Sequence, residues 1–120
     1  MDKRSLGMFG EDAAVRFLRK KGYSIVERNF SCRFGEIDII ARKADFVVFV
    51  EVKLRKNSDY AEAREFVTAA KQRRIISSAS LWLSFKQCQL QPRFDVIEIY
   101  APEGESSRKL QINHLEDAFQ

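Results

Sequence analysis

The chain has 120 residues, of which 45% are hydrophobic and 32% are charged, a composition typical of one folded domain rather than a disordered tail. Apolar runs stay well short of the roughly 20 residues of a membrane span, and no apolar stretch of a signal peptide follows Met1. We therefore expect a cytoplasmic protein without a membrane partner. The net charge of +4 mildly favours a polyanionic partner such as nucleic acid.

The first half of the chain predicts one helix followed by three strands. Residues 6–21 carry apolar side chains at the spacing of an amphipathic helix, and Gly22 follows as a helix stop. Residues 23–30 are rich in strand-forming side chains. Two denser runs, 35–41 and 46–54, predict strands that a tight turn joins into a hairpin.

A second helix is expected after this hairpin. The polar segment 56–59 ends the strand pattern and offers capping residues for the helix. An apolar stripe then runs from Ala63 to Leu83, and its phase slips near Arg74, which predicts a bend or a change of face there.

The end of the chain predicts smaller elements. Residues 93–100 form a further strand, 104–107 a loop, 109–113 a short edge strand and 115–119 a last helical turn. The order of elements indicates an α/β fold, with an αβββαβ core in which helices flank one mixed sheet.

This pattern contains no linker, so we expect one domain over residues 1–120. Its core spans about residues 5–101, and residues 108–120 add the C-terminal strand and short helix.

Charged residues interrupt the two central strands. Asp38 lies within the first strand, and Glu51 and Lys53 lie within the second. A two-residue turn at Ala44-Asp45 would place Asp38 opposite Glu51, and Glu36 opposite Lys53.

Strand alternation then sorts the hairpin into two faces. One face combines the four charged residues with Ile40 and Phe49. The other face is entirely apolar and is expected to be core: Ile37, Ile39, Val48, Val50, Val52 and Leu54.

Two opposed carboxylates repel one another unless a cation, a raised pKa or water offsets the repulsion. Mg²⁺ or Mn²⁺ would fit oxygen ligands of this kind, and Lys53 could activate water or steady a phosphate beside it. A solvated face with a Glu36–Lys53 salt bridge is the alternative. It explains Asp38 less well, because Asp is a weak strand former and here faces another acid.

Asp38 followed by Glu51-Val52-Lys53 resembles the D…ExK signature of PD-(D/E)xK nucleases, which have the restriction-endonuclease-like fold. Over nearly its whole length the chain also resembles the bacterial YraN-like family, which is related to archaeal Holliday-junction resolvases. The segments that carry this resemblance follow in order: Gly10-Glu11-Asp12-Ala13-Ala14, Gly22-Tyr23, Arg28-Asn29, residues 35–41, residues 48–55, Lys71 and Arg93-Phe94-Asp95-Val96.

The resemblance implies a restriction-endonuclease-like core and a Mg²⁺- or Mn²⁺-dependent endonuclease acting on structured or branched DNA, with RNA as the less favoured substrate. It implies that Asp38 and Glu51 are metal ligands and that Lys53 is the catalytic lysine. Glu11 matches a further catalytic and metal-binding acid on the first helix, although a solvated helix acid is the alternative reading of its position. Glu36 is expected to assist the metal site. Because resolvase-like relatives act as two-fold dimers, a homodimer is also implied.

Basic residues near this hairpin and on the second helix are candidate nucleic-acid contacts. We expect Arg55, Lys71 and Arg74 to bind phosphate, with solvated strand-end and helix positions as the alternative. Two rivals to the nuclease remain open. One is a nucleic-acid-binding or scaffold protein that keeps the fold without cutting, and the other is a protein adaptor that uses the sheet edge at 109–113.

Overall fold

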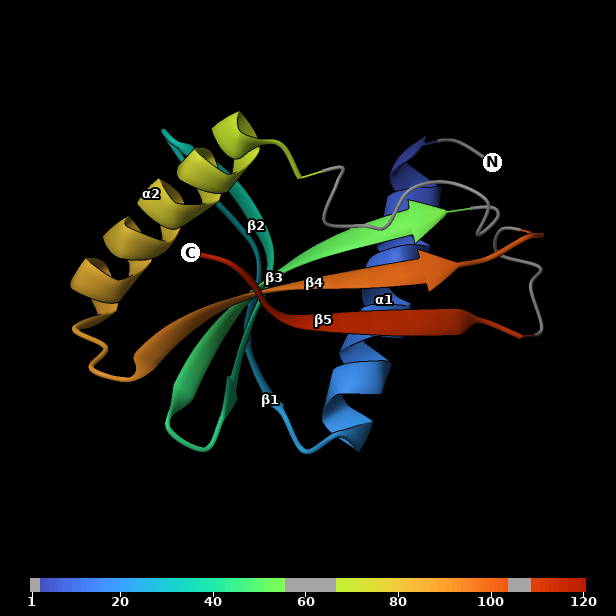
Figure 1. The fold of residues 1–120 in the computed structure, drawn as a ribbon, viewed down its shortest axis with the longest axis horizontal. Coiled ribbons are helices and arrows are strands. Elements are labelled where there is room, and N and C mark those ends of the chain that lie inside the picture. The colour runs from blue at the N-terminus through green and yellow to red at the C-terminus, as the bar shows by residue number, and fades with distance from the viewer. Residues whose placement is uncertain (1–2, 56–66, 104–108) are drawn as a thin grey trace.

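The computed structural model describes residues 3–55, 67–103 and 109–120. The chain forms a helix, three strands, a second helix and two further strands (Figure 1). In chain order the elements are α1 (Lys3–Lys20), β1 (Ser24–Cys32), β2 (Gly35–Lys43), β3 (Phe46–Arg55), α2 (Ala69–Lys86), β4 (Gln91–Tyr100) and β5 (Gln111–Phe119).

All five strands belong to one mixed sheet, in the order β1-β2-β3-β4-β5. The first three strands are antiparallel neighbours, β3 and β4 are parallel, and β5 is antiparallel to β4. Parallel neighbours need a crossover, which α2 provides between β3 and β4. The two helices lie on opposite sides of the twisted sheet (Figure 1), so the predicted αβββαβ core is confirmed in one small domain. No helix in the described ranges is long and apolar enough to cross a bilayer.

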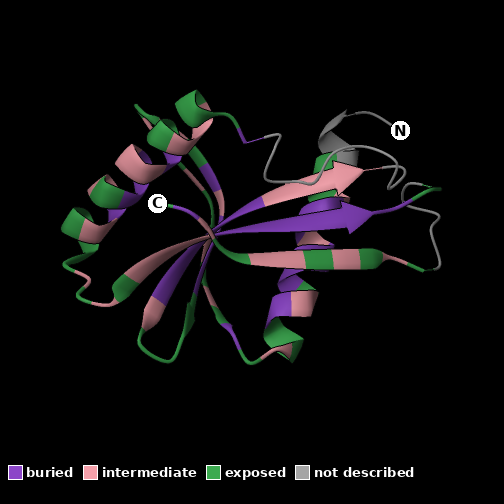
Figure 2. Ribbon diagram, in the orientation of Figure 1, coloured by how far each residue is buried: buried purple, intermediate pink, exposed green. Residues whose placement is uncertain are grey.

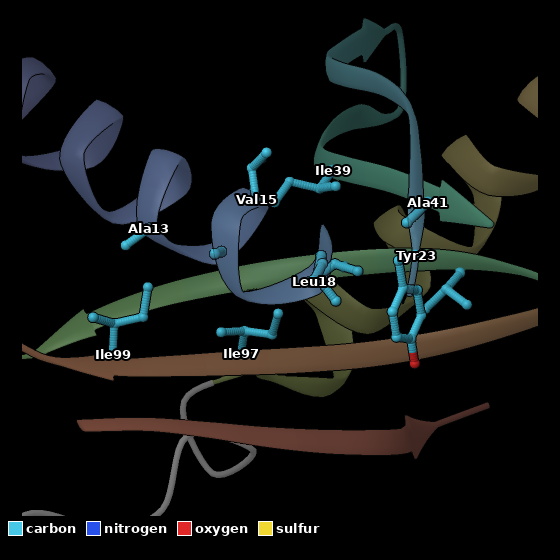
Figure 3. Packing of buried hydrophobic residues seen from close by; sticks show 11 residues of the cluster. Ala13, Val15, Leu18, Tyr23, Ile39, Ala41, Ile97 and Ile99 are labelled. Atoms are coloured by element: carbon cyan, nitrogen blue, oxygen red, sulfur yellow. The ribbon is translucent and has the colours of Figure 1, made fainter. Parts of the chain in front are cut away.

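The core on the α1 side is built from one stripe of the helix and alternate residues of the strands (Figure 3). The predicted helix is confirmed, and it ends before Gly22, whose φ of 92° suits a residue without a side chain. The buried residues of this cluster are Ala13, Ala14, Val15, Leu18, Tyr23, Ile39, Ala41, Val48, Val50, Ile97 and Ile99.

The core on the α2 side is more aromatic. The Phe49 ring stacks on Phe94 at 5.5 Å between centroids and meets Trp82 edge-on at 5.8 Å. Figure 2 shows buried residues where α2 faces the sheet and exposed residues on its outer side. Both faces of the sheet are therefore covered around Phe49. A charged side chain buried near Phe49 needs an ionic or hydrogen-bonding partner, because an unpaired buried charge is costly.

The hairpin register agrees with the prediction from the two-residue turn. Pairs run from Lys43 with Phe46 to Ile39 with Val50, and Ala44 in the turn has φ 53°. The predicted face of Ile37 is wrong, because Ile37 packs in the α2-side cluster while Ile39 packs on the α1 side. Simple alternation fails at this point because the β2–β3 pairing ends at Ile39.

Helix α2 begins later than its apolar stripe suggested. The polar segment 56–59 and Ala63, which were expected to start this helix, lie outside the described residues. The helix begins at Ala69 and continues unbroken through Arg74, where a bend was expected. Thr68 caps it, since its hydroxyl accepts a hydrogen bond from the Lys71 N–H at 3.1 Å.

Removal of this cap should weaken the start of α2. We expect Thr68→Ala to lower the free energy of unfolding by about 1 kcal/mol, because one N–H of the first turn loses its acceptor. Thr68→Ser keeps the hydroxyl and should stay near wild type. Urea denaturation of the three proteins measures the difference, and equal stability of the alanine and serine variants would contradict the capping role.

The expected helical turn at 115–119 is wrong, since β5 continues as one strand from Gln111 to Phe119. Leu115 pairs with Val96 while Phe119 pairs with Phe94, so β5 carries extra residues at a bulge. Asp117 adopts φ 52° within it. Because of the bulge, Leu115 and Phe119 both pair with β4 although they are four positions apart. Apolar residues at this spacing are also typical of a helix, which explains the incorrect prediction.

Candidate functional site

The candidate site lies where β2 separates from β3. Backbone pairing between these strands ends at Ile39 and Val50. Just beyond this pair, the Asp38 carboxylate accepts a hydrogen bond from the Val52 N–H at 2.8 Å. Asp38 is thus held between the strands by a backbone donor and is not simply paired across the sheet with Glu51, as the regular hairpin had suggested.

A cavity of about 180 Å³ opens on the α2 side of this separation. Asp38 and Glu51 both line it, together with Glu36 from β2 and Lys71 and Arg74 from α2. Burial raises the pKa of Asp38 to about 7, and the Glu51 carboxylate adds to the increase. The two acids predicted as metal ligands therefore share one cavity and interact electrostatically.

Two lysines approach the Glu51 carboxylate. Lys71 Nζ lies 2.5 Å from Glu51 Oε1, and Lys53 Nζ lies 3.6 Å from the same oxygen. The Glu51 side chain is only 7% exposed, so these ammonium groups offset a buried negative charge. Lys71 was predicted only as a phosphate contact, and its ion pair with Glu51 was missed.

The two lysines have opposite pKa shifts. Burial, followed by the hydrogen bond and positive charge of Lys71, lowers the pKa of Lys53. Burial alone would also lower the pKa of Lys71, but the hydrogen bond and charge of Glu51 outweigh it and raise that pKa. Lys53 is therefore the amine that gives up a proton more readily, which suits the lysine predicted to act on water.

A second cavity, of about 650 Å³, reaches Asp38 from the α1 side. Glu11 of α1 lines it and is largely buried, and its charge also contributes to the raised pKa of Asp38. Glu11 Oε1 accepts hydrogen bonds from Arg28 Nε at 2.8 Å and Asn29 Nδ2 at 3.0 Å. The structure thus places Glu11 next to Asp38 and fixes it through two β1 side chains.

Asn29 is a site residue that the sequence reasoning did not identify. Its neighbours Arg28 and Phe30 pair with Ile39 and Ile37, so Asn29 lies opposite Asp38 on the adjoining strand. It lines the larger cavity and has φ 54°, a conformation that Asn tolerates better than most residues. The only signal in the sequence was the Arg28-Asn29 pair within the family resemblance, because β1 carries several other polar residues.

The remaining predicted residues lie at the margin of the site. Glu36 is exposed and lines both cavities, but its expected position opposite Lys53 is not part of the β2–β3 pairing. Arg74 is exposed on the rim of the smaller cavity. Arg55 is the last residue of β3 and lines neither cavity.

Asp38 and Glu51 supply carboxylate oxygens, the kind of ligand that a divalent cation prefers, to one cavity. Among the residues that the structure describes, no three histidine, cysteine or acidic side chains gather into a ready-made metal cage. Mg²⁺ commonly uses only one or two carboxylates and completes its shell with water and substrate phosphate. Asp38, desolvated beside a second carboxylate, is a group whose ionised form a cation would stabilise.

Comparisons with known proteins find similar sequences over most of the chain. Residues 10–99 match the model of the uncharacterised protein family UPF0102. A UPF0102 protein of Clostridium perfringens is 48% identical over 117 residues, which cover 97% of this chain and 94% of that protein. UPF0102 proteins of Geotalea daltonii and Flavobacterium psychrophilum are 47% and 40% identical, over 98% of this chain and 91% and 96% of their own lengths.

Proposed function

The chain belongs to the uncharacterised protein family UPF0102, and we propose that it is a metal-dependent nuclease that hydrolyses phosphodiester bonds in structured or branched DNA. One observation carries this proposal. Asp38 and Glu51 line the same small cavity, and Lys53 and Lys71 approach the buried Glu51 carboxylate. Carboxylates and lysines in this arrangement supply the groups that phosphodiester hydrolysis needs.

Asp38 and Glu51 would hold Mg²⁺ or Mn²⁺, which when bound polarises the phosphate and makes water more acidic. The Val52 N–H orients the Asp38 carboxylate at this position. Lys53, with its lowered pKa, accepts a proton from the attacking water, and its charged form steadies the phosphate. Water attacks in line, the phosphorus–oxygen bond to the leaving sugar breaks, and the departing oxygen takes up a proton from the surrounding water.

Substrate binding is supported by the basic groups near this cavity. Lys71 and Arg74 line it from α2, and the chain carries a net charge of +4. The preference for branched DNA and the homodimer rest on likeness to resolvase-related nucleases, and both belong to the proposal.

The expected result is Mn²⁺-dependent cleavage that needs both Glu51 and Lys53. We expect Glu51→Ala to lower the rate at least about 10³-fold through loss of the metal ligand. Lys53→Ala should lower it about 10²- to 10⁴-fold through loss of proton transfer. A gel assay with linear, nicked, flapped and four-way DNA, and with a matched RNA set, measures both effects.

Glu116→Gln is the matched control, because it removes an exposed carboxylate far along β5 from the site. Cleavage that persists in both site variants would indicate a contaminating nuclease. Equal DNA binding by wild type and Glu51→Ala, without cleavage or metal binding by either, would favour the non-catalytic nucleic-acid-binding alternative.

A further inference from the structure

Lys71 forms an ion pair with Glu51, one of the two proposed metal ligands. It makes the short contact to Glu51 Oε1, at 2.5 Å, whereas Lys53 from the same strand as Glu51 stays at 3.6 Å. An ammonium group at this oxygen weakens the binding of a cation to the same carboxylate, because the two positive charges repel. The ion pair and a metal ion at the proposed site therefore compete for the Glu51 carboxylate.

The placement of Lys71 is unusual for a helix start. It lies in the first turn of α2, where the helix dipole favours acidic side chains and disfavours cations, and α2 has no acid there. The Thr68 cap fixes the Lys71 backbone, and Arg74, three residues later, lines the same cavity. The first turn of α2 thus places positive charge near the carboxylates, although the helix dipole disfavours cations at this end of a helix.

Lys71 is also free to change partner. Its side chain is 34% exposed, and lysine carries a compact charge on a long flexible stem. The same cavity that holds the carboxylates is lined by Arg74, so a phosphate bound there meets two basic groups.

We propose that Lys71 is an exchangeable partner: it occupies Glu51 in the free protein and transfers to a backbone phosphate of the nucleic acid when a divalent cation binds. This inference rests on the proposed function. The exchange of Lys71 has two expected consequences: the free protein binds metal more weakly, and it binds metal more strongly once nucleic acid is present. By linkage, metal must strengthen nucleic-acid binding by the same factor.

Mn²⁺ titration of the free, full-length protein by calorimetry tests the first consequence. Lys71→Met keeps the length of the side chain but removes its charge, and we expect it to bind Mn²⁺ about tenfold more tightly than wild type. Lys71→Arg keeps the charge and should stay close to wild type. The matched control is Arg73→Met, which removes an exposed charge two residues further along α2 and should change Mn²⁺ affinity less than about twofold.

Anisotropy of a labelled four-way DNA tests the second consequence. Lys53→Ala serves as the background so that cleavage does not interfere. Mn²⁺ should strengthen DNA binding about tenfold in Lys53→Ala and clearly less in Lys53→Ala/Lys71→Met. Thermal unfolding in EDTA verifies folding, and Lys71→Gln replaces Lys71→Met if the apolar substitution prevents folding.

The two levels of the proposal fail differently. If wild type binds Mn²⁺ and Lys71→Met binds it equally or more weakly, the proposed exchange of Lys71 is wrong. The nuclease proposal would not be affected by that result. Absence of Mn²⁺ binding in wild type and in all Lys71 variants would overturn both.

Discussion

Asp38→Asn should abolish cleavage and yet stabilise the metal-free protein, by up to about 4 kcal/mol near pH 8. Burial and the Glu51 charge raise the pKa of Asp38, which means that the ionised carboxylate destabilises the folded state. Asparagine removes the charge and keeps an oxygen that can accept from the Val52 N–H. Loss of the metal ligand should lower the cleavage rate at least about 10³-fold.

The pH dependence has a definite sign. Because the folded pKa of Asp38 is about 7, the folded state retains a proton that the unfolded chain releases above about pH 4. Wild-type stability in EDTA should therefore decrease as pH rises from about 4 to 7 and level off near pH 8. This decrease should be missing in Asp38→Asn.

Urea denaturation between about pH 5 and 8 measures both effects. Asp45→Asn, in the exposed hairpin turn, is the matched control and should follow the wild-type profile. A lower free energy of unfolding for Asp38→Asn at pH 8 would show that the carboxylate is favourable in the fold.

The second large effect concerns stability alone. Asp95→Ala should lower the free energy of unfolding by about 3–5 kcal/mol, because it removes the acceptor of a buried ionic network. Asp95 is 0% exposed and accepts hydrogen bonds from Arg93 Nε and Nη2, from His114 Nε2 and from the Asp117 N–H, at 2.7–3.0 Å. Without it, Arg93 and the nearly buried His114 lose the carboxylate that both contact, and β5 loses a tie to β4. Arg93 keeps its hydrogen bond with Tyr23, and His114 keeps its contact with Lys21.

The pH signature of this network is opposite to that of Asp38. Burial would raise the pKa of Asp95, but the hydrogen bonds from His114, Arg93 and the Asp117 N–H lower it. Its stabilisation is therefore present above about pH 4 and is lost in acid, as pH falls through the lowered pKa.

Urea denaturation at about pH 7 measures the loss. Asp95→Asn should be intermediate, because the amide oxygen still accepts a hydrogen bond while the charge is gone. Asp45→Ala is the exposed control. A loss below about 1 kcal/mol for Asp95→Ala would contradict the role of this network in holding β5.

The central hairpin can be predicted because the residues that determine it lie close together in the sequence. Two dense apolar runs and a short turn determine the register from Lys43–Phe46 to Ile39–Val50. The Arg93–Asp95 ion pair is local as well, because residues two positions apart on one strand share a face. Where the register breaks, as at Ile37 or at the β5 bulge, sequence periodicity was misleading because it assumes an evenly pleated strand.

The sequence predicts which acidic residues belong to the candidate site, but it does not predict which residues contact them. Asp38, Glu51 and Lys53 are conspicuous because they interrupt apolar strands. The contacts of Glu51 with Lys71 and of Glu11 with Asn29 depend on how α2 and α1 pack across the sheet. Those contacts join residues distant in the chain, and no spacing rule connects them.

The most direct test is whether Asp38 and Glu51 together bind a divalent cation. Calorimetric titration with Mn²⁺ should give binding at the millimolar level or tighter for wild type and for the exposed control Glu116→Gln. The same titration should give no binding for Glu51→Gln, while its thermal unfolding in EDTA shows a folded protein. Equal Mn²⁺ affinity of wild type and folded Glu51→Gln would contradict a metal site at these two carboxylates.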